Sequence, residues 1–291
     1  MIGILIHILP QEIDQLEQTL IQLKKNSKYV VDHQFMVEVV LNNNLTDWSK
    51  SKIDKNYFSN KLNKLEELTK SWAETNFWIS NDNEVLGCTD SHRLAGEKYN
   101  LDAFIWLDVD IVFSDTLLYH MVEGYNTLKK NNKYIIITPE TTRLWDNTWD
   151  VITNENCLNE GASHENYFNR DPYSTTGLMG EVELNKINTF KFASGWATLL
   201  SNDLIKKIVI PNKMGSYYMD DTFIMACCEY GKQKGFKADQ YVLINEVIIE
   251  NNKFRYNHYK NYIHSINRKE EFMKIAQDNF QSSVVDFLNT L

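Results

Sequence analysis

The chain has 291 residues, enough to bury a sizeable core in one large α/β domain or two small ones. Its composition is that of a globular protein, and its formal net charge of -9 argues against a general electrostatic grip on nucleic acid. The four cysteines include no C-x-x-C metal pair, and the adjacent Cys227 and Cys228 are more typical of buried small residues than of a disulfide. We therefore expect a reducing, cytoplasmic location.

The first residues predict a β-α-β unit. Residues 2–9 form an apolar run that lacks the basic flank and cleavage site of a signal peptide and is too short to span a bilayer, so we expect a buried strand and no membrane anchor. Apolar residues recur at helical spacing over residues 11–25, and residues 35–41 predict a second strand that ends in a polar turn at residues 42–44. This order implies parallel strands joined by a right-handed crossover.

The rest of the chain continues the alternation of helices and strands. Helices are predicted over residues 62–73, 87–99, 117–129, 202–208, 220–231 and 269–291, and strands over residues 103–107, 134–138, 190–200 and 241–249. Residues 140–184 have little periodicity, which is typical of a lid or binding loop, or of strands that the pattern does not reveal. Arg143, Trp145 and Trp149 in this segment are candidates for acceptor binding. With no repeats or proline-rich linker, the pattern predicts a single α/β domain.

The motif Asp108-Val-Asp110 follows the apolar strand at residues 103–107 and is the main chemical signal. In open α/β sheets, ligands bind at the carboxyl ends of the strands, where this motif would lie. Mg²⁺ and Mn²⁺ prefer oxygen ligands and can bridge carboxylates to a diphosphate. The motif therefore predicts a divalent metal site. The alternative is that the two carboxylates cap the following turn, or a helix that begins near Ser114 and Asp115.

Four segments together resemble the GT-A fold nucleotide-diphospho-sugar glycosyltransferases, in particular the family-2-like group. They are the two opening strands with their polar turn, the stretch Gly87-Cys-Thr-Asp-Ser-His-Arg93 before the aspartate motif, the turn Phe192-Ala-Ser-Gly-Trp196, and Tyr218-Met-Asp220-Asp221. The resemblance implies a GT-A-like, Rossmann-related and mostly parallel central sheet flanked by helices, in one catalytic domain over residues 1–291. Residues 1–139 would form the nucleotide-sugar-binding half, residues 140–265 the acceptor-binding and catalytic half, and residues 266–291 a C-terminal helix.

The activity that the resemblance implies is transfer of a sugar from a nucleotide-diphosphate donor to a hydroxyl acceptor, such as a glycan, with Mn²⁺ or Mg²⁺ as cofactor. Asp221 would be the base of an inverting reaction, with Asp220 as its neighbour, and His264 would complete the metal site in competition with His258. The residues placed at the donor are Asn42, Arg93, Asp108 and Trp196. A nucleic-acid acceptor is disfavoured by the acidic charge but left open.

Several of these residues also have a structural interpretation. Asp220 and Asp221 are compatible with capping of the helix that follows them, and Arg93 with a salt-bridged surface position. Trp196 is as typical of a core as of a sugar-stacking platform. The chain departs from the family pattern in the asparagines of residues 42–44, in the missing Asn after Arg93, and in the absence of the Q-x-x-R-W motif of processive synthases.

Two other functions are compatible with the motif. Asp108-Val-Asp110-Ile-Val112 matches the D-x-D-x-[TV] motif of haloacid-dehalogenase-like phosphohydrolases, in which Asp108 would be a phosphorylated nucleophile and Asp110 a general acid. In that family, however, the motif opens the fold, whereas here two predicted strands precede it. The second alternative is a sugar- or nucleotide-binding module without turnover, which would need no base at Asp221.

Overall fold

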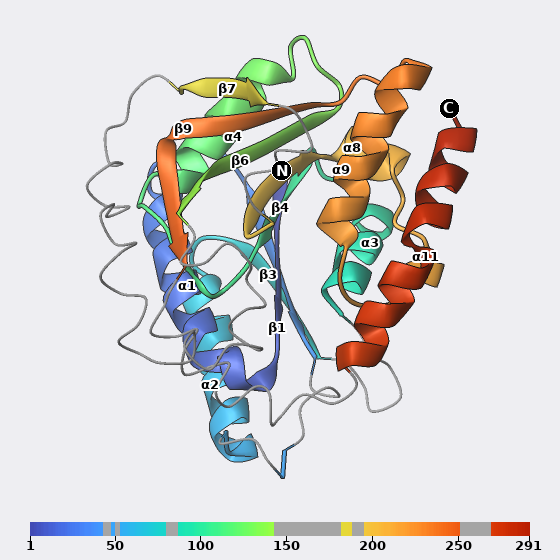
Figure 1. Ribbon diagram of the computed structural model, residues 1–291. Helices are drawn as coiled ribbons and strands as arrows, with labels where there is room; N and C mark the ends of the chain where they lie inside the picture. The colour runs from blue at the N-terminus through green and yellow to red at the C-terminus, as the bar shows by residue number, and fades with distance from the viewer. Residues whose placement is uncertain (43–47, 50–52, 80–86, 143–181, 188–194, 251–268) are drawn as a thin grey trace.

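The computed structural model describes the chain except for residues 43–47, 50–52, 80–86, 143–181, 188–194 and 251–268 (Figure 1). The described residues form one nine-stranded sheet in the order β3-β2-β1-β4-β8-β6-β9-β5, and β7 pairs with β9 beside this path. The strands are β1 (Ile2–Ile8), β2 (Phe35–Leu41), β3 (Glu74–Ile79), β4 (Ala103–Leu107), β5 (Ile111–Val112), β6 (Ile135–Thr142), β7 (Leu184–Ile187), β8 (Ala197–Ser201) and β9 (Asp239–Glu250).

The strand directions confirm the predicted fold class. β1 is parallel to β2 and β4, β2 is parallel to β3, and β6 is parallel to β9. β8 is antiparallel to both β4 and β6, and the short β5 and β7 are antiparallel to β9. Six of the nine strands thus point one way and β5, β7 and β8 point the other. The molecule is an α/β protein with a mostly parallel, Rossmann-related sheet.

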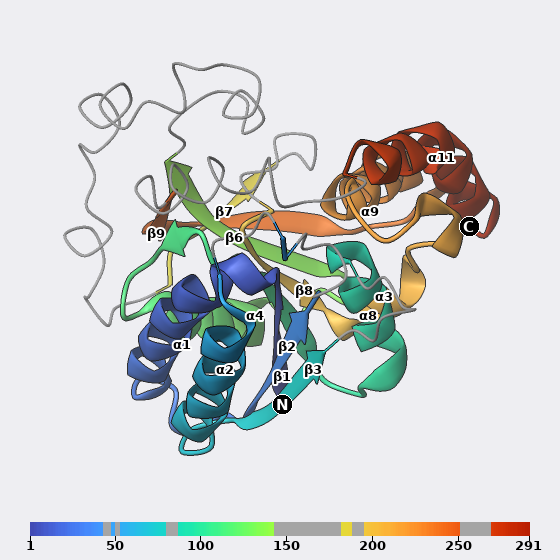
Figure 2. The same ribbon diagram turned by 90° about the horizontal axis from the view of Figure 1, so that it is seen from below.

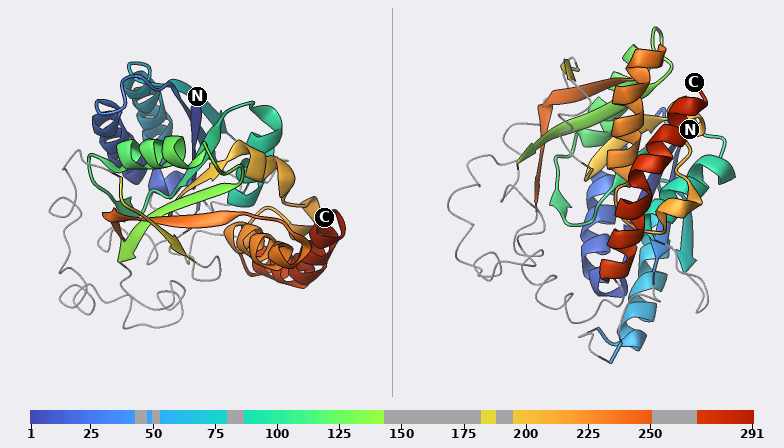
Figure 3. Two further views of the ribbon diagram at one scale, coloured as in Figure 1. Left: turned by 90° about the horizontal axis from the view of Figure 1, so that it is seen from above. Right: turned by 45° about the vertical axis from the view of Figure 1, so that its right-hand side comes forward.

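Helices cover both faces of the sheet, as Figure 2 shows from below. One face carries α1 (Ile13–Ser27), α2 (Lys55–Thr69) and α4 (Leu117–Leu128), and the other carries α3 (Cys88–Lys98), α8 (Asn202–Lys207), α9 (Asp220–Gly231) and α11 (Lys269–Asn289). Short 3₁₀ turns lie at η1 (Pro10–Glu12), η4 (Asn212–Met214) and η5 (Lys232–Lys234). Figure 3 shows α11 running alongside α9, against which it packs.

Two hydrophobic layers hold this arrangement together. β2 and β4 are buried along their whole length, which explains their unbroken apolar sequences. On the α1 side, Leu16, Leu20 and Leu23 are fully buried against the sheet, and on the α9 side Phe223 and Cys227 are buried. Each fully buried side chain of the Leu or Phe type contributes about 1.5–3 kcal/mol, so the two layers account for most of the stabilisation.

Some element boundaries differ from the sequence-based predictions. α2 begins at Lys55 rather than residue 62, because the Asp54 side chain accepts hydrogen bonds from the Asn56 and Tyr57 N–H groups and caps the helix. Pro139 does not end β6, which continues to Thr142. A register shift between β6 and β9 at Pro139 absorbs the irregularity. β3, β5 and β7 were not predicted. Among the described residues, no helix is long and apolar enough to cross a membrane.

Candidate functional site

The carboxyl ends of β1, β2 and β4 meet at one edge of the sheet, and the predicted donor and metal residues follow them. Asn42 comes directly after β2. It is fully buried, and its N–H donates to the Ile8 carbonyl at 2.9 Å. Asp108 comes directly after β4 and is exposed, Asp110 is partly exposed, and Val109 between them is buried in the core. The buried valine fixes the motif at the sheet edge while both carboxylates remain accessible to solvent.

A polar stripe on α1 holds the chain that follows the aspartate motif. Thr19 donates to the Val109 carbonyl at 3.5 Å, and the Gln22 amide donates to the Phe113 carbonyl at 3.0 Å. Asn26 donates to the Ser114 carbonyl at 2.9 Å. The three side chains lie on one face of the helix and are buried within an otherwise apolar layer. Together they bind the backbone of the segment that contains and follows the aspartate motif.

The start of α4 takes its hydrogen bonds from residues other than the two aspartates of the motif. The Thr116 N–H donates to Ser114 Oγ at 3.1 Å, and the Leu118 N–H donates to Asn26 Oδ1 at 2.9 Å. Ser114 and Thr116 in turn donate to the fully buried Glu246 at 2.6 and 2.7 Å. Ser114 and Asn26 thus bind two of the N–H groups at the beginning of α4, a role that the capping interpretation gives to the aspartate motif.

The turn before α9 has an unusual backbone. Tyr218 and Met219 both have positive φ angles, 72° and 62°, although neither is glycine. The turn lies against the start of α3, where the Thr89 N–H donates to the Ser216 carbonyl at 3.2 Å. A Cβ atom on Gly87 would lie 1.7 Å from that same oxygen. Conformations of this kind cost about 1–3 kcal/mol each and persist where the surroundings impose them, often at functional sites.

Asp220 and Asp221 form the first turn of α9, but their environments differ. Asp220 is buried and bonded to His92 Nδ1, and the His92 ring stacks on Trp106 with centroids 3.7 Å apart and planes at 2°. Burial opposes ionisation of Asp220, but the charge and hydrogen bond of His92 outweigh it and hold its pKa below the usual range. Asp220 is therefore the paired, ionised member.

Asp221 is the perturbed member of the pair. Burial and the negative charge of Asp220 raise the pKa of its carboxyl to about 6, despite hydrogen bonds to Asp221 Oδ1 from the Thr222 N–H at 2.6 Å and Thr222 Oγ1 at 3.1 Å. A carboxyl group with such a pKa can accept a proton near neutral pH. Two adjacent titratable groups whose environments push their pKa values apart are the usual arrangement at an acid–base centre.

A short series of contacts joins Asp221 to the aspartate motif. Asp221 Oδ2 lies 2.5 Å from the position that a Cβ atom on Gly195 would occupy, so the carboxylate packs against the Gly195 backbone. The next residue, Trp196, accepts a hydrogen bond from the Asp108 N–H at 2.8 Å. The Gly195–Trp196 turn thus lies between the two acidic groups. The absence of a side chain at Gly195 is what allows the approach.

Trp196 and Arg93 both have partners within the protein, and their donor-binding roles stay predictions. Trp196 is 8% exposed and belongs to the core, and its backbone carbonyl accepts the Asp108 N–H. Arg93 makes four hydrogen bonds, to the carbonyls of Ile210, Pro211 and Gly215 and to Asp90 at 2.5 Å. Its guanidinium group therefore fixes the chain that leads to Tyr218.

Sequence reasoning missed His92 and Cys88 as members of the site. Both lie on α3 within the stretch that carries the family resemblance, four residues apart, and hence on one helix face toward the acidic groups. Burial and the charges of Asp220 and Asp108 raise the pKa of the Cys88 thiol well above its usual value. The sequence signal that could have identified them is a titratable residue within about a turn of the glycine that begins the helix.

The third metal ligand was predicted to be a histidine in the C-terminal part of the chain. His264 and its competitor His258 lie outside the described residues, as do Arg143, Trp145 and Trp149. Within the described part of the chain, no group of three or more His, Cys, Asp or Glu side chains is arranged to hold a metal ion. The predicted metal site therefore rests on Asp108 and Asp110.

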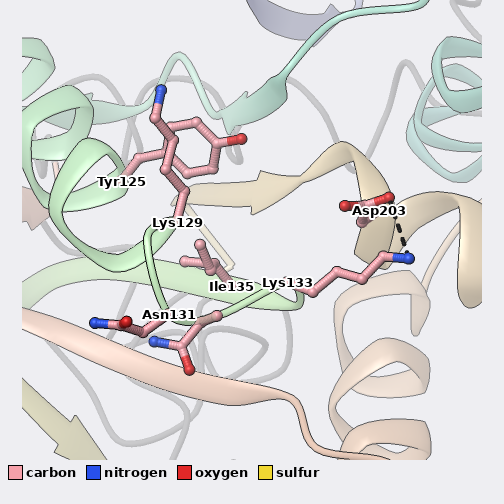
Figure 4. Close-up of a pocket in the computed structure, with 7 residues that line it drawn as sticks. Tyr125, Lys129, Asn131, Lys133, Ile135 and Asp203 are labelled. Atoms are coloured by element: carbon pink, nitrogen blue, oxygen red, sulfur yellow. Dashed lines mark ion pairs between the residues drawn. The ribbon is translucent and has the colours of Figure 1, made fainter.

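Two of the hollows formed by the described residues lie away from this cluster of acidic groups. One, of about 330 Å³, lies at the opposite end of the sheet and is lined by Tyr125, Lys129, Lys133 and Asp203 among others (Figure 4). The Tyr125 hydroxyl donates to the carbonyl of Asp102, just before β4 begins, which marks this as the amino end of that strand. The other, of about 120 Å³, is mostly apolar and lies between α3 and α8, behind the His92 ring.

The fold and the site define an α/β protein with a mostly parallel sheet and acidic groups gathered where its parallel strands end. No family model and no curated protein sequence matches the chain. Among solved structures, it is similar to S. aureus TarS. The crystal structure of TarS 1-349 aligns over 94% of this chain and 69% of that one, with 10% identity and a TM-score of 0.47.

Two further structures of the same protein align in a similar way. TarS 1-349 in complex with UDP gives 12% identity and a TM-score of 0.47 over the same shares of the two chains. The crystal structure of TarS gives 11% identity and a TM-score of 0.48, and covers 94% of this chain and 42% of that one. At these values the likeness concerns the arrangement of helices and strands alone.

Proposed function

We propose that this protein is a metal-dependent glycosyltransferase that moves a sugar from a nucleotide-diphosphate donor to a hydroxyl acceptor, such as a glycan, with inversion at the anomeric carbon. One observation supports this proposal most directly. The Gly195–Trp196 turn brings Asp221, with a pKa of about 6, next to the segment that carries Asp108. Sugar transfer needs these two functions together, a proton acceptor and a site for the leaving diphosphate.

The two aspartates of the motif fit a hard divalent cation. They are oxygen ligands at an accessible strand end, separated by a buried valine, and their segment is held by α1. When bound there, Mn²⁺ or Mg²⁺ would neutralise the negative charge that develops on the departing diphosphate. Asp108 and Asp110 would hold the cation, and the buried Asn42 would support the end of β2 beside the nucleoside rather than contact it.

Asp221 would act as the base. Its carboxylate accepts the proton of the acceptor hydroxyl as that oxygen attacks the anomeric carbon and the bond to the diphosphate breaks. The raised pKa suits this task, because a base works best when its pKa lies near the operating pH. Arg93 would act indirectly, by holding the backbone that leads to the turn before α9.

The decisive test is release of nucleoside diphosphate from a panel of nucleotide sugars in the presence of Mn²⁺. We expect slow hydrolysis of one donor without an acceptor, abolished by EDTA. Asp110→Ala should lower the rate by roughly 10²-fold or more, whereas Asp115→Asn, a nearby carboxylate that accepts a bond from the Gln22 amide at 2.7 Å, should retain it. Hydrolysis of phosphomonoesters with every nucleotide sugar left intact would overturn the proposal in favour of a phosphohydrolase.

The role of Asp221 needs a separate measurement. Asp221→Asn should abolish transfer while donor binding, measured by calorimetry, stays close to that of the wild type. Equal loss of binding and transfer would mean that Asp221 only supports the structure. We also propose a cytoplasmic location, which the free thiols of Cys88, Cys227 and Cys228 support.

A further inference from the structure

His92 is held by two different contacts at the back of the acidic pair. One nitrogen of its ring, Nδ1, bonds to Asp220 Oδ2, and the ring face stacks on Trp106 at the end of β4. The His92 and Asp220 side chains are only 13% and 11% exposed. The stack fixes the plane of the imidazole, and its position on α3 fixes the direction of Nδ1. The ring therefore presents Nδ1 to Asp220 in one orientation.

We propose that His92 is a positioning residue that assigns the role of base to Asp221 by holding Asp220 in a separate hydrogen bond. The inference rests on the proposed glycosyl transfer and goes beyond it, since it explains how one of two adjacent carboxylates is selected. Asp220 is bonded and turned toward α3. Asp221 Oδ2 faces Gly195 on the side of the aspartate motif.

The hydrogen bond between His92 and Asp220 matters because of the backbone conformation just before α9. Met219 is the N-cap residue of the helix, it is left-handed, and no side chain caps the helix at that position. The first turn is closed by the Phe223 N–H, which donates to the Met219 carbonyl at 2.8 Å. A helix start that leaves the ordinary backbone regions needs support from its surroundings. His92 supplies that support to the first residue of the helix, next to the base.

The selection has a chemical consequence. During transfer, the acceptor oxygen forms a bond to the anomeric carbon and its proton passes to Asp221. The bond between that carbon and the diphosphate oxygen breaks, and its electron pair leaves with the diphosphate. An Asp220 released from His92 would be a second carboxylate able to turn toward the same hydroxyl. Holding it away leaves one base in one geometry, which matters because small misplacements cost large factors in rate.

The test separates the hydrogen bond of His92 from its ring. His92→Phe keeps a flat ring to stack on Trp106 but cannot bond to Asp220. His92→Asn keeps an N–H donor attached to Cγ, as in histidine, and loses the ring. We expect His92→Phe to lower kcat by roughly 10- to 100-fold with little change in the KM for the donor, and His92→Asn to restore most of the rate. Glu97→Gln, which lines the hollow behind the ring, is the matched control and should behave as wild type.

Each outcome decides the question. Equal kcat for wild type and His92→Phe, or equal losses for the Phe and Asn variants, would overturn the proposal, the second because packing alone would then explain the effect. If the wild type transfers no sugar, the proposed function fails, and crystal structures of the same variants decide the positioning role. Asp220 and Asp221 should be displaced in His92→Phe and restored in His92→Asn, and an unmoved pair would overturn it.

Discussion

In the proposed reaction, the single carboxyl group of Asp221 is expected to affect both the rate and the stability of the protein. Burial and the charge of Asp220 raise its pKa to about 6, so near pH 6 it changes from a protonated acid to a free base. Transfer requires the ionised form. We therefore expect kcat/KM to rise with pH through about 6 and to level off above it, as measured with the preferred donor across a buffer series.

The charge of Asp220 can be removed to test the cause of this pH dependence. In Asp220→Asn the repulsion that raises the pKa of Asp221 is lost, so the acid limb of the profile should move to lower pH. The rate at the plateau should fall as well, because the bond to His92 is weakened. A limb that stays at the same pH in Asp220→Asn would show that another group controls it.

The same group should reduce stability at the pH at which the protein works. The folded-state pKa of Asp221 lies above the ordinary value of 3.8, so the folded state binds its proton more tightly than the unfolded chain does. That contribution to stability is fully present below about pH 4 and is lost as pH rises through about 6. Asp221→Asn should therefore raise Tm by a few degrees at pH 8 and by much less at pH 4. A lower Tm at pH 8 would contradict this account.

Gly195 gives a steric test of the same contact. A methyl group there would meet Asp221 Oδ2 at 2.5 Å, so Gly195→Ala should displace the carboxylate and lower transfer by roughly 10²-fold. The matched control is Gly124→Ala in α4, where the nearest atoms are at 3.4 Å or more and a helical Ala is favourable. If steady-state rates of both variants equal that of the wild type, the contact between Asp221 and Gly195 does not matter for transfer.

At the scale of elements, α1 shows how a helix can support a site that it does not form. Asn26 bonds to the Ser114 carbonyl and to the Leu118 N–H, which lie on either side of the start of α4. Asn26→Leu has a similar shape but leaves both buried groups without that partner. We expect a loss of about 2–6 kcal/mol in the free energy of unfolding, measured in urea, at about 1–3 kcal/mol for each group. The exposed Lys25→Ala is the control and should change stability little.

The strands and helices that the sequence predicts well are those whose pattern is decided locally. β2, β4 and α9 have the predicted limits, because each is a continuous apolar run or a periodic helix with clear ends. β3 was missed because it is a half-exposed edge strand that pairs only with β2 and has no clean alternation. α2 was started too late because its N-terminal half buries little beyond Phe58.

The candidate site likewise contains residues that short motifs identify and residues whose partners are distant in sequence. Asp108, Asp110, Asp220 and Asp221 could be found because they form short motifs next to predicted elements. The partnership of His92 with Asp220 joins residues 128 positions apart and could not be read from either segment. The same holds for Arg93, whose carbonyl partners lie on η4 and its flanks. Tertiary contacts decide such roles, and no periodicity reports them.

At the scale of the whole molecule, the candidate site lies where the direction of the strands in the sheet reverses. β4 is the last strand of the parallel group β3-β2-β1-β4, and β8 beside it runs the opposite way. The end of β4 is therefore next to the start of β8, which places the Gly195–Trp196 turn beside Asp108. The aspartate motif comes from one half of the chain and the acidic pair from the other. Neither half contains the complete site.

Ligands that bind only the folded state stabilise it, so binding of a metal ion and a diphosphate at the proposed site should be visible in thermal unfolding. Mn²⁺ together with a matching nucleoside diphosphate should raise Tm more than the sum of their separate effects, because a cation held by Asp108 and Asp110 would bind the diphosphate as well. Asp110→Ala should remove the joint effect and leave the Tm of the unliganded protein nearly unchanged. Additive shifts in the wild type would argue against a shared metal site.

The left-handed pair Tyr218–Met219 has a consequence for how this protein can change over evolutionary time. Glycine is the residue most at ease in such a backbone, and substitution there would relax the turn and favour the folded state. Drift toward greater robustness would therefore favour glycine at these two positions, while selection for transfer would favour the bulkier side chains that keep the turn rigid. If the proposed transfer depends on this turn, a lineage that retains both residues would keep the rate at the expense of stability.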